Sequence, residues 1–365
     1  MPSPSGVLSA IQFAGNRRVR GPSLALHLVT GGSGFVGSNI ARLLLARGEA
    51  VRVLDTWRDD AQSPAIDFVA ADINDRDAVA RAMQGVSYVH HNVALVPLAK
   101  AGRRFWTVNV DGTRTALEAA RSAGVKMFCH MSSSAVFGMP TEMPITDKTP
   151  LQPIEIYGRA KLAAEELVKQ AGREDMPVSV VRPRTIVGPG RLGIFEILFD
   201  WIRDGANIYI IGPGTYPFQF VQVDDLAEVS ILSALQERPG LFNAGTDRFG
   251  SLRQDLGALI AHAGSPSRIK SLPVWLAMSS LTVLDKLRLS PLGPWHYKTY
   301  HKPFYFDVQP TKDALGWTPK YDNVAILTNA YDWFVRARAE RPAAGGSFHK
   351  QPVKQGILRL LKKMS

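Results

Sequence analysis

The sequence predicts an α/β protein whose core is a doubly wound parallel sheet, followed by a smaller mixed lobe. Short β-rich segments alternate with helical segments through the first half of the chain. This alternation is typical of a parallel sheet covered by helices on both faces. Because crossovers between parallel strands are right-handed, we expect the sheet to be doubly wound. The second observation is a glycine-rich turn between the first strand and the first helix.

The expected elements follow in a regular order. The β-rich segments are 24–30, 50–55, 65–73, 86–95, 125–131 and 177–183. The helical segments between them are 38–48, 75–85, 109–124 and a helix that contains "YGRAK" at 157–161. Branched and aromatic residues enrich the β-rich segments, as strands require.

The pattern loosens after residue 190, where Gly- and Pro-rich turns and aromatic residues become frequent. We therefore expect a dinucleotide-binding domain over 24–190, to which 219–246 returns to complete the sheet. The segments 191–218 and 247–336 are expected to form a smaller substrate lobe.

Positive charge is concentrated at the two ends of the chain. The net charge is +11, of which residues 1–23 carry +3, residues 341–365 carry +6 and residues 24–340 only +2. A nucleic-acid-binding protein more often places its charge on the folded surface that contacts phosphate, so no nucleic-acid partner is expected. The single cysteine, Cys129, excludes a disulfide framework and indicates a reducing, cytoplasmic setting.

Both termini are expected to lie outside the folded body. In residues 1–23 the apolar stretch precedes the arginines, the reverse of the order in a secretory signal, so no such signal is expected. The segment is expected to be a disordered leader, or an artefact of where translation was taken to start. Residues 337–365 are expected to form a flexible basic tail that ends in a basic amphipathic helix at 356–365. This helix either contacts the inner membrane surface peripherally or docks on the protein's own body or a second subunit, which leaves a homodimer open.

One further apolar run covers residues 272–284. It is too short to span a bilayer, which takes about 20 residues. We expect it to form a buried helix or one wall of an apolar pocket.

Three glycines after the first strand predict a phosphate-binding turn. The spacing of Gly31, Gly34 and Gly37 allows a tight turn, close approach of the backbone to a pyrophosphate, and N–H donors from the following helix. Asp55 ends the second strand, where a carboxylate binds ribose hydroxyls and repels the 2′-phosphate of NADP. NAD is therefore the expected cofactor. Arg58 nearby leaves NADP open, and the alternative role for Asp55 is to cap its own loop.

Several motifs occur together in one order along the chain. They are "TGGSGFVG", Asp55, "ADI" at 71–73, "SSSAVFG" at 132–138, "YGRAK" at 157–161, "RPRTIVGPG" at 182–190 and "VQVDDLA" at 221–227. As a set they resemble the extended short-chain dehydrogenase/reductase family, whose best-known branch is the NAD-dependent epimerase/dehydratases. The resemblance covers most of residues 24–335 and implies a Rossmann-type sheet.

The resemblance also implies a catalytic triad. Tyr157 and Lys161, four residues apart, share one helix face; a lone pair of this kind is more often a surface pair. In the family, the tyrosine is the general acid or base and the lysine favours its phenolate, whose pKa is otherwise near 10. Ser133, five residues before Gly138, would hold the reacting oxygen in place.

Cofactor contacts follow from the same resemblance. Asp72 and Ile73 match positions near adenine, Val93 and Ala94 match backbone that lines the cofactor, and Asn109 is a neighbour. No metal ligands are expected. The full set of expected cofactor contacts is Gly31, Ser33, Gly34, Phe35, Val36, Gly37, Asp55, Asp72, Ile73, Val93, Ala94, Asn109, Tyr157, Lys161 and Pro183.

The chain departs from two branches of this family. The 4,6-dehydratases carry an Asp-Glu pair where this chain has Ser134 and Ala135, so dehydration is not expected. Sugar-nucleotide epimerases usually clamp the substrate diphosphate with two arginines, but Phe218 and Lys302 occupy the matching regions. The candidates to compensate are Arg182, Arg184 and Arg191.

Three functions for a small-molecule substrate stay open. The leading one is epimerase-type chemistry on a nucleotide- or carrier-linked sugar, through reversible hydride transfer at a secondary carbinol. The alternative resembles the 3β-hydroxysteroid dehydrogenases and acts on a lipophilic secondary alcohol, which Phe218, the run 272–284 and the basic tail suit. A non-catalytic NAD-binding scaffold is the third, and the intact triad argues against it.

Overall fold

The computed structural model describes residues 25–97, 101–191, 194–286, 294–340 and 362. Its centre is a seven-stranded parallel sheet with the strand order β10-β6-β5-β4-β1-β2-β3. The order reverses between β1 and β4, so the sheet is doubly wound, as predicted. The strands are β1 (Leu26–Thr30), β2 (Ala50–Asp55), β3 (Asp67–Ala70), β4 (Tyr88–His91), β5 (Met127–Met131), β6 (Val178–Pro183) and β10 (Gly240–Ala244).

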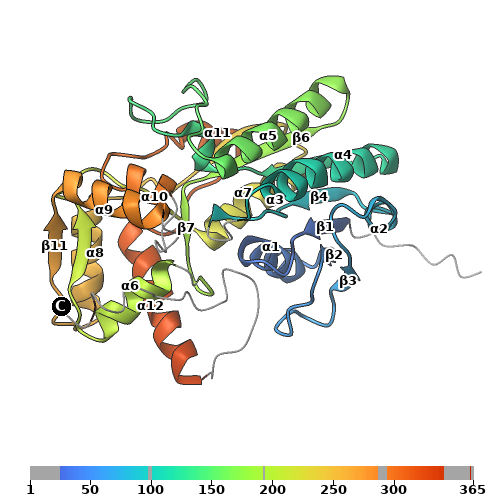
Figure 1. Cartoon of the computed structure of the whole chain (residues 1–365). Helices are drawn as coiled ribbons and strands as arrows, with labels where there is room; N and C mark the ends of the chain where they lie inside the picture. Colours follow the sequence, from blue (N-terminus) through green and yellow to red (C-terminus); the bar gives the residue numbers. More distant parts are fainter. Residues whose placement is uncertain (1–24, 98–100, 192–193, 287–293, 341–361, 363–365) are drawn as a thin grey trace, which may run out of the picture.

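Helices cover both faces of the sheet (Figure 1). The helices α1 (Phe35–Ala46) and α7 (Val223–Leu235) pack together on one face, while α2 (Arg76–Ala82), α4 (Gly112–Ala123) and α5 (Ile156–Glu174) pack on the other. Neighbouring residues of a strand serve opposite faces: Leu28 joins the cluster under α2 and α4, and Val29 joins the cluster under α1. Every residue of β4 and β5 is buried, as a doubly covered parallel sheet requires.

Most of the later helices gather in a second lobe that lies to one side of the main sheet (Figure 1). In this lobe β8 (Ile208–Ile211) pairs with β11 (Ile269–Leu272), and a second small parallel sheet pairs β7 (Thr185–Val187) with β9 (Phe220–Gln222), both inside the segments predicted for the first domain. The aromatic core of the second lobe includes Phe199, Trp201 and Phe334. The remaining helices are α3 (Arg104–Trp106), α6 (Ile194–Arg203), α8 (Leu252–His262), α9 (Val274–Lys286), α10 (Pro294–Thr299), α11 (Gln309–Leu315) and α12 (Asn323–Glu340).

The lobe confirms the predicted mixed architecture, whereas its boundaries stay a prediction. The segment α11 packs against β10 and α7, at the edge of the main sheet. The helix α12 continues to Glu340, so residues 337–340 are helical and the prediction that the flexible tail begins at 337 is wrong.

The prediction of a buried helix over 272–284 is also wrong. Residues from Val274 onward form α9, but Trp275 is 71% exposed and Val283 is 56% exposed. The helix packs on α10 and buries Ala277. Met278, Leu281 and Leu284 are half-buried, and Val274 and Leu276 are exposed with Trp275 and Val283. No helix in the described ranges is both long and apolar enough to span a bilayer.

Both expected terminal segments lie largely outside the described residues. The leader 1–23 is wholly outside them, and of the amphipathic helix at 356–365 only Lys362 is described. Its ammonium lies 2.6 Å from Asp200 and 2.7 Å from Asp204 at the end of α6. This contact is with the protein's own body, and membrane contact stays a prediction.

Candidate active site

The glycine turn after β1 leaves no room for larger residues. Gly31 has φ +67°, and a Cβ on it would lie 2.9 Å from the backbone nitrogen of Val93. A Cβ on Gly37 would lie 2.3 Å from the carbonyl oxygen of Gly31. Gly34 is the N-cap of α1, whose first turn contains no acidic residue. A helix N-terminus carries backbone N–H groups and the positive end of the helix dipole, which suits a phosphate.

Asp55 lies at the carboxyl end of β2, beside this turn. Its Oδ2 accepts the N–H of Ser33 at 3.0 Å, and its Oδ1 accepts the N–H of Thr56 at 2.7 Å. Burial raises the pKa of the Asp55 carboxyl, while these hydrogen bonds act in the opposite direction. Oδ1 also accepts from the Thr56 hydroxyl at 3.5 Å, so the carboxylate holds its own loop beside the glycine turn, and its contact with a ribose stays a prediction.

A cavity of about 420 Å³ runs along the carboxyl ends of the central strands. This edge, where the strand order reverses, is where open α/β sheets bind ligands. Most of the residues expected at the cofactor line the cavity, namely Gly31, Gly34, Phe35, Val36, Gly37, Asp55, Asp72, Ile73, Val93, Ala94, Tyr157, Lys161 and Pro183, and Ser133 lines it with them.

Two expected cofactor residues, Ser33 and Asn109, do not line the cavity. The Ser33 hydroxyl is buried and donates to the carbonyl of Trp57 at 2.7 Å. Asn109 lies in a π-helical turn (Thr107–Asp111) and makes two hydrogen bonds with the backbone of Leu95, at 2.8 and 3.2 Å. Both residues therefore support loops that line the cavity, and any direct contact with a cofactor stays a prediction.

The three residues of the expected triad meet at the middle of this cavity. Ser133 caps a short 3-10 helix (Ser134–Phe137), and Tyr157 and Lys161 lie one turn apart on α5. A Cβ on Gly158 would lie 2.7 Å from the carbonyl oxygen of Ala135. Glycine after the tyrosine thus lets α5 approach this helix, and Ser133 lies near enough to Tyr157 to act on the pKa of its phenol.

Burial shifts the titration of both groups on α5. It raises the pKa of Tyr157 to about 12, although the Ser133 hydrogen bond and the charge of Arg191 oppose this. It lowers the pKa of Lys161 to about 8, and the negative charge of Glu165 opposes that change. The Lys161 ammonium donates to the carbonyl of Met131 at 2.5 Å. At neutral pH the lysine remains protonated beside a phenol that is also protonated.

Glu165 is a site-supporting residue that the sequence analysis missed. Its carboxylate accepts from Ser132 at 2.8 Å and from Lys169 at 2.8 Å, and it forms a buried ion pair with Arg182. Burial disfavours its charged form, but Arg182 and Lys169 outweigh burial and lower its pKa. Glu165 follows Lys161 by four residues on the same helix face, and this spacing was the available signal. Because Arg182 is paired with Glu165, it does not compensate for a missing substrate arginine.

The outer part of the cavity is mixed in character. Arg184, Arg191 and Tyr300 line it together with the apolar side chains of Ile186, Ile194 and Phe195. Phe218, in the region where an epimerase arginine was expected, is buried and packs edge-on against Phe220 and Tyr300. Lys302, in the other such region, does not line the cavity.

The parallel sheet, glycine turn and terminal carboxylate define an NAD-binding oxidoreductase fold. The model of the NAD-dependent epimerase/dehydratase family matches residues 27–245, and the chain belongs to that family. The family is NAD-dependent. The glycine turn fits a dinucleotide, because side chains at Gly31 or Gly37 would clash with the backbone that has to approach the cofactor.

Relatives in this family differ in activity. The chain is 32% identical to a 3 beta-hydroxysteroid dehydrogenase/Delta 5→4-isomerase of Mycobacterium tuberculosis, over 87% of this chain and 94% of the relative. It is 29% identical to a UDP-glucose 4-epimerase of Lactobacillus helveticus, over 84% of this chain and 96% of the relative. The crystal structure of a Thermotoga maritima UDP-glucose 4-epimerase with UDP-glucose is similar, with a TM-score of 0.72, 25% identity, and 86% and 99% of the two chains covered.

Proposed function

We propose that this protein catalyses reversible hydride transfer at a secondary carbinol, with Ser133, Tyr157 and Lys161 as its catalytic residues. The observation that carries the proposal is that Ser133, Tyr157 and Lys161 line one cavity together with the glycine turn. Bound NAD⁺ supplies the hydride acceptor. Gly31, Gly34 and Gly37 would hold its pyrophosphate, and Asp55 would hold its adenosine ribose.

Proton transfer falls to the residues of the chain. The Tyr157 Oη takes the proton of the substrate hydroxyl, while the Ser133 hydroxyl keeps the substrate oxygen in place. A tyrosine pKa of about 12 is too high for a base at neutral pH. The charge of Arg191 opposes this rise in the structure. In the proposed mechanism the Lys161 ammonium, protonated up to about pH 8, and the positive charge of an oxidised nicotinamide favour the phenolate further.

For the substrate, the apolar side of the cavity favours net oxidation of a largely lipophilic secondary alcohol. Phe218 is buried in an aromatic cluster and offers no donor to a diphosphate. The relative named as a 3 beta-hydroxysteroid dehydrogenase covers nearly the whole chain. Epimerase-type chemistry on a nucleotide-linked sugar is the second candidate, because full-length relatives bear the name UDP-glucose 4-epimerase.

Cofactor retention separates these two candidates. Purified protein is denatured and the supernatant is assayed for NAD(H). Empty protein that binds added NAD⁺ reversibly supports net dehydrogenation with cofactor release. A stoichiometric cofactor carried through purification supports a closed redox cycle, as an epimerase requires, and would overturn the proposed net oxidation.

Tyr157→Phe tests the catalytic assignment. We expect hydride transfer to fall by roughly 10²- to 10⁴-fold, with NAD⁺ affinity nearly unchanged. Tyr209→Phe is the matched control, because Tyr209 is 38% exposed and lies outside the cavity lining. Wild-type turnover in Tyr157→Phe would refute the assignment.

A further inference from the structure

Arg184 is buried without a carboxylate partner. Its side chain is 2% exposed and lies between the rings of Phe218 and Phe304, with its Cζ 4.9 and 4.2 Å from their centroids. Among the described residues its guanidinium makes one hydrogen bond, from Nη1 to the Ser134 hydroxyl at 3.4 Å, and its Nε–H has no acceptor. A guanidinium carries five N–H donors, so most of its capacity is unused.

Arg182, two residues earlier, provides an internal comparison. It is 1% exposed, and there the protein supplies the buried carboxylate of Glu165. Removing a guanidinium from water without such a partner is costly, and burial correspondingly lowers the pKa of Arg184 to about 9. A cation kept in this state needs a reason in function, because an apolar side chain would fill the same space at a lower cost.

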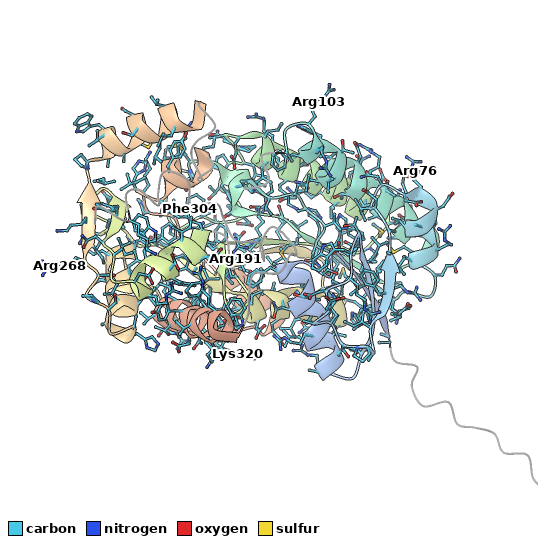
Figure 2. The ribbon with its side chains drawn as sticks, turned by 60° about the horizontal axis from the view of Figure 1, so that its bottom comes forward. Arg76, Arg103, Arg191, Arg268, Phe304 and Lys320 are labelled. Atoms are coloured by element: carbon cyan, nitrogen blue, oxygen red, sulfur yellow. The ribbon has the colours of Figure 1, made fainter. Side chains whose placement is uncertain are left out.

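The unused donors belong to the wall of the catalytic cavity. Arg184 and Ser134 both line it, and Ser134 follows Ser133 directly, so their Cα atoms are about 3.8 Å apart. Arg191, another arginine of the cavity lining, packs over Phe35 at 5.3 Å and acts electrostatically on Tyr157. Figure 2 shows Arg191 and Phe304 in the middle of the molecule, and Arg268 at its edge.

We propose that Arg184 and Ser134 form a subsite for a compact anionic group, a carboxylate or a phosphate, carried next to the carbinol carbon that Ser133 and Tyr157 hold. This subsite rests on the proposed hydride transfer, because its position is defined relative to the carbinol carbon that is oxidised. The short step from Ser133 to Ser134 suits a substituent on a neighbouring carbon. It does not suit a diphosphate on the far side of a sugar ring. The substrate is then an otherwise lipophilic hydroxy acid or hydroxy phosphate, with Arg191 adding positive potential.

Anion binding can be measured without turnover. NAD⁺-loaded Tyr157→Phe protein is titrated calorimetrically with 3-hydroxybutyrate, with its uncharged amide 3-hydroxybutyramide, and with glycerol 3-phosphate against glycerol. We expect at least one anionic probe to bind roughly 10- to 100-fold more tightly than its neutral partner, the factor that a charged hydrogen bond supplies. The two arms distinguish a carboxylate from a phosphate.

Variants assign this selectivity to Arg184. Arg184→Met should abolish it and Arg184→Lys should keep part of it. Arg268→Met, an exposed arginine away from the cavity, should leave it unchanged. Equal affinity for the acid and the amide and for the phosphate and glycerol, or selectivity that survives Arg184→Met, would overturn the proposal. So would tight binding of UDP that depends on Arg184 when neither anionic probe binds.

A stability measurement separates an anion subsite from a structural prop. Because Arg184→Met removes a buried cation that has no carboxylate partner, its thermal midpoint should be at or above that of the parent protein. A lower midpoint, together with unchanged anion selectivity in Arg184→Met, would mark Arg184 as structural. Anion selectivity in a protein that oxidises no tested alcohol would refute only the proposed function. Oxidation of the hydroxy acid and its amide at equal rates would refute only the anion subsite.

Discussion

Replacing Lys161 with methionine should change how the stability of the cofactor-free protein depends on pH. The lysine is 2% exposed, and burial lowers its pKa from 10.5 to about 8. Between these two values the unfolded chain binds a proton that the native protein lacks. Stability therefore rises with pH in this window, and below about pH 8 the full cost of the buried charge is present.

The size of this effect follows from the same numbers. One pKa unit is worth about 1.4 kcal/mol, so the lowered pKa corresponds to about 3 kcal/mol. We expect the free energy of unfolding of the wild type, relative to Lys161→Met, to rise by about this amount between pH 7 and pH 10.5.

Urea unfolding at a series of pH values measures this difference directly. Lys126→Met is the control, because Lys126 is an exposed lysine and its substitution should give a nearly flat difference. A flat difference for Lys161→Met as well would refute the reasoning, since the lysine would then titrate as it does in the unfolded chain.

Three further results are expected. Asp55→Asn should weaken NAD⁺ binding more than NADP⁺ binding in fluorescence titrations, whereas an equal loss would show that the carboxylate only holds its loop. Glu165→Gln should lower the free energy of unfolding by about 3–5 kcal/mol, because it leaves Arg182 buried and unpaired. Glu166→Gln, on the exposed side of the same helix, should change it by less than about 0.5 kcal/mol, and equal effects would contradict the burial argument. Trp275→Ser should likewise stay within about 0.5 kcal/mol in urea unfolding, since the indole is 71% exposed; a large loss would reveal a packing partner in solution.

The sequence alone was sufficient for the features that depend on local spacing. Alternating segments predicted the doubly wound sheet, because the hydrophobic periodicity that distinguishes strands from helices depends only on neighbouring residues. The glycine spacing predicted the turn that a Cβ at Gly31 or Gly37 would obstruct. The motifs also placed Asp55, Tyr157 and Lys161 on elements whose carboxyl ends or faces meet at one cavity.

Contacts between distant segments needed the tertiary structure. Glu165 pairs with Arg182 across 17 residues, and Arg184 meets Phe218 and Phe304 from the second lobe. Two arginines only two positions apart therefore have different environments. Arg182 has a carboxylate counter-ion, whereas Arg184 lines the cavity without one. The prediction of a buried helix over 272–284 failed for the same reason. Composition shows which side chains a helix could bury, but not whether another element covers them. Local motifs can thus be identified from the sequence. Whether a charged side chain has a counter-ion, and whether an apolar side chain is exposed, depends on which distant segments the fold brings together.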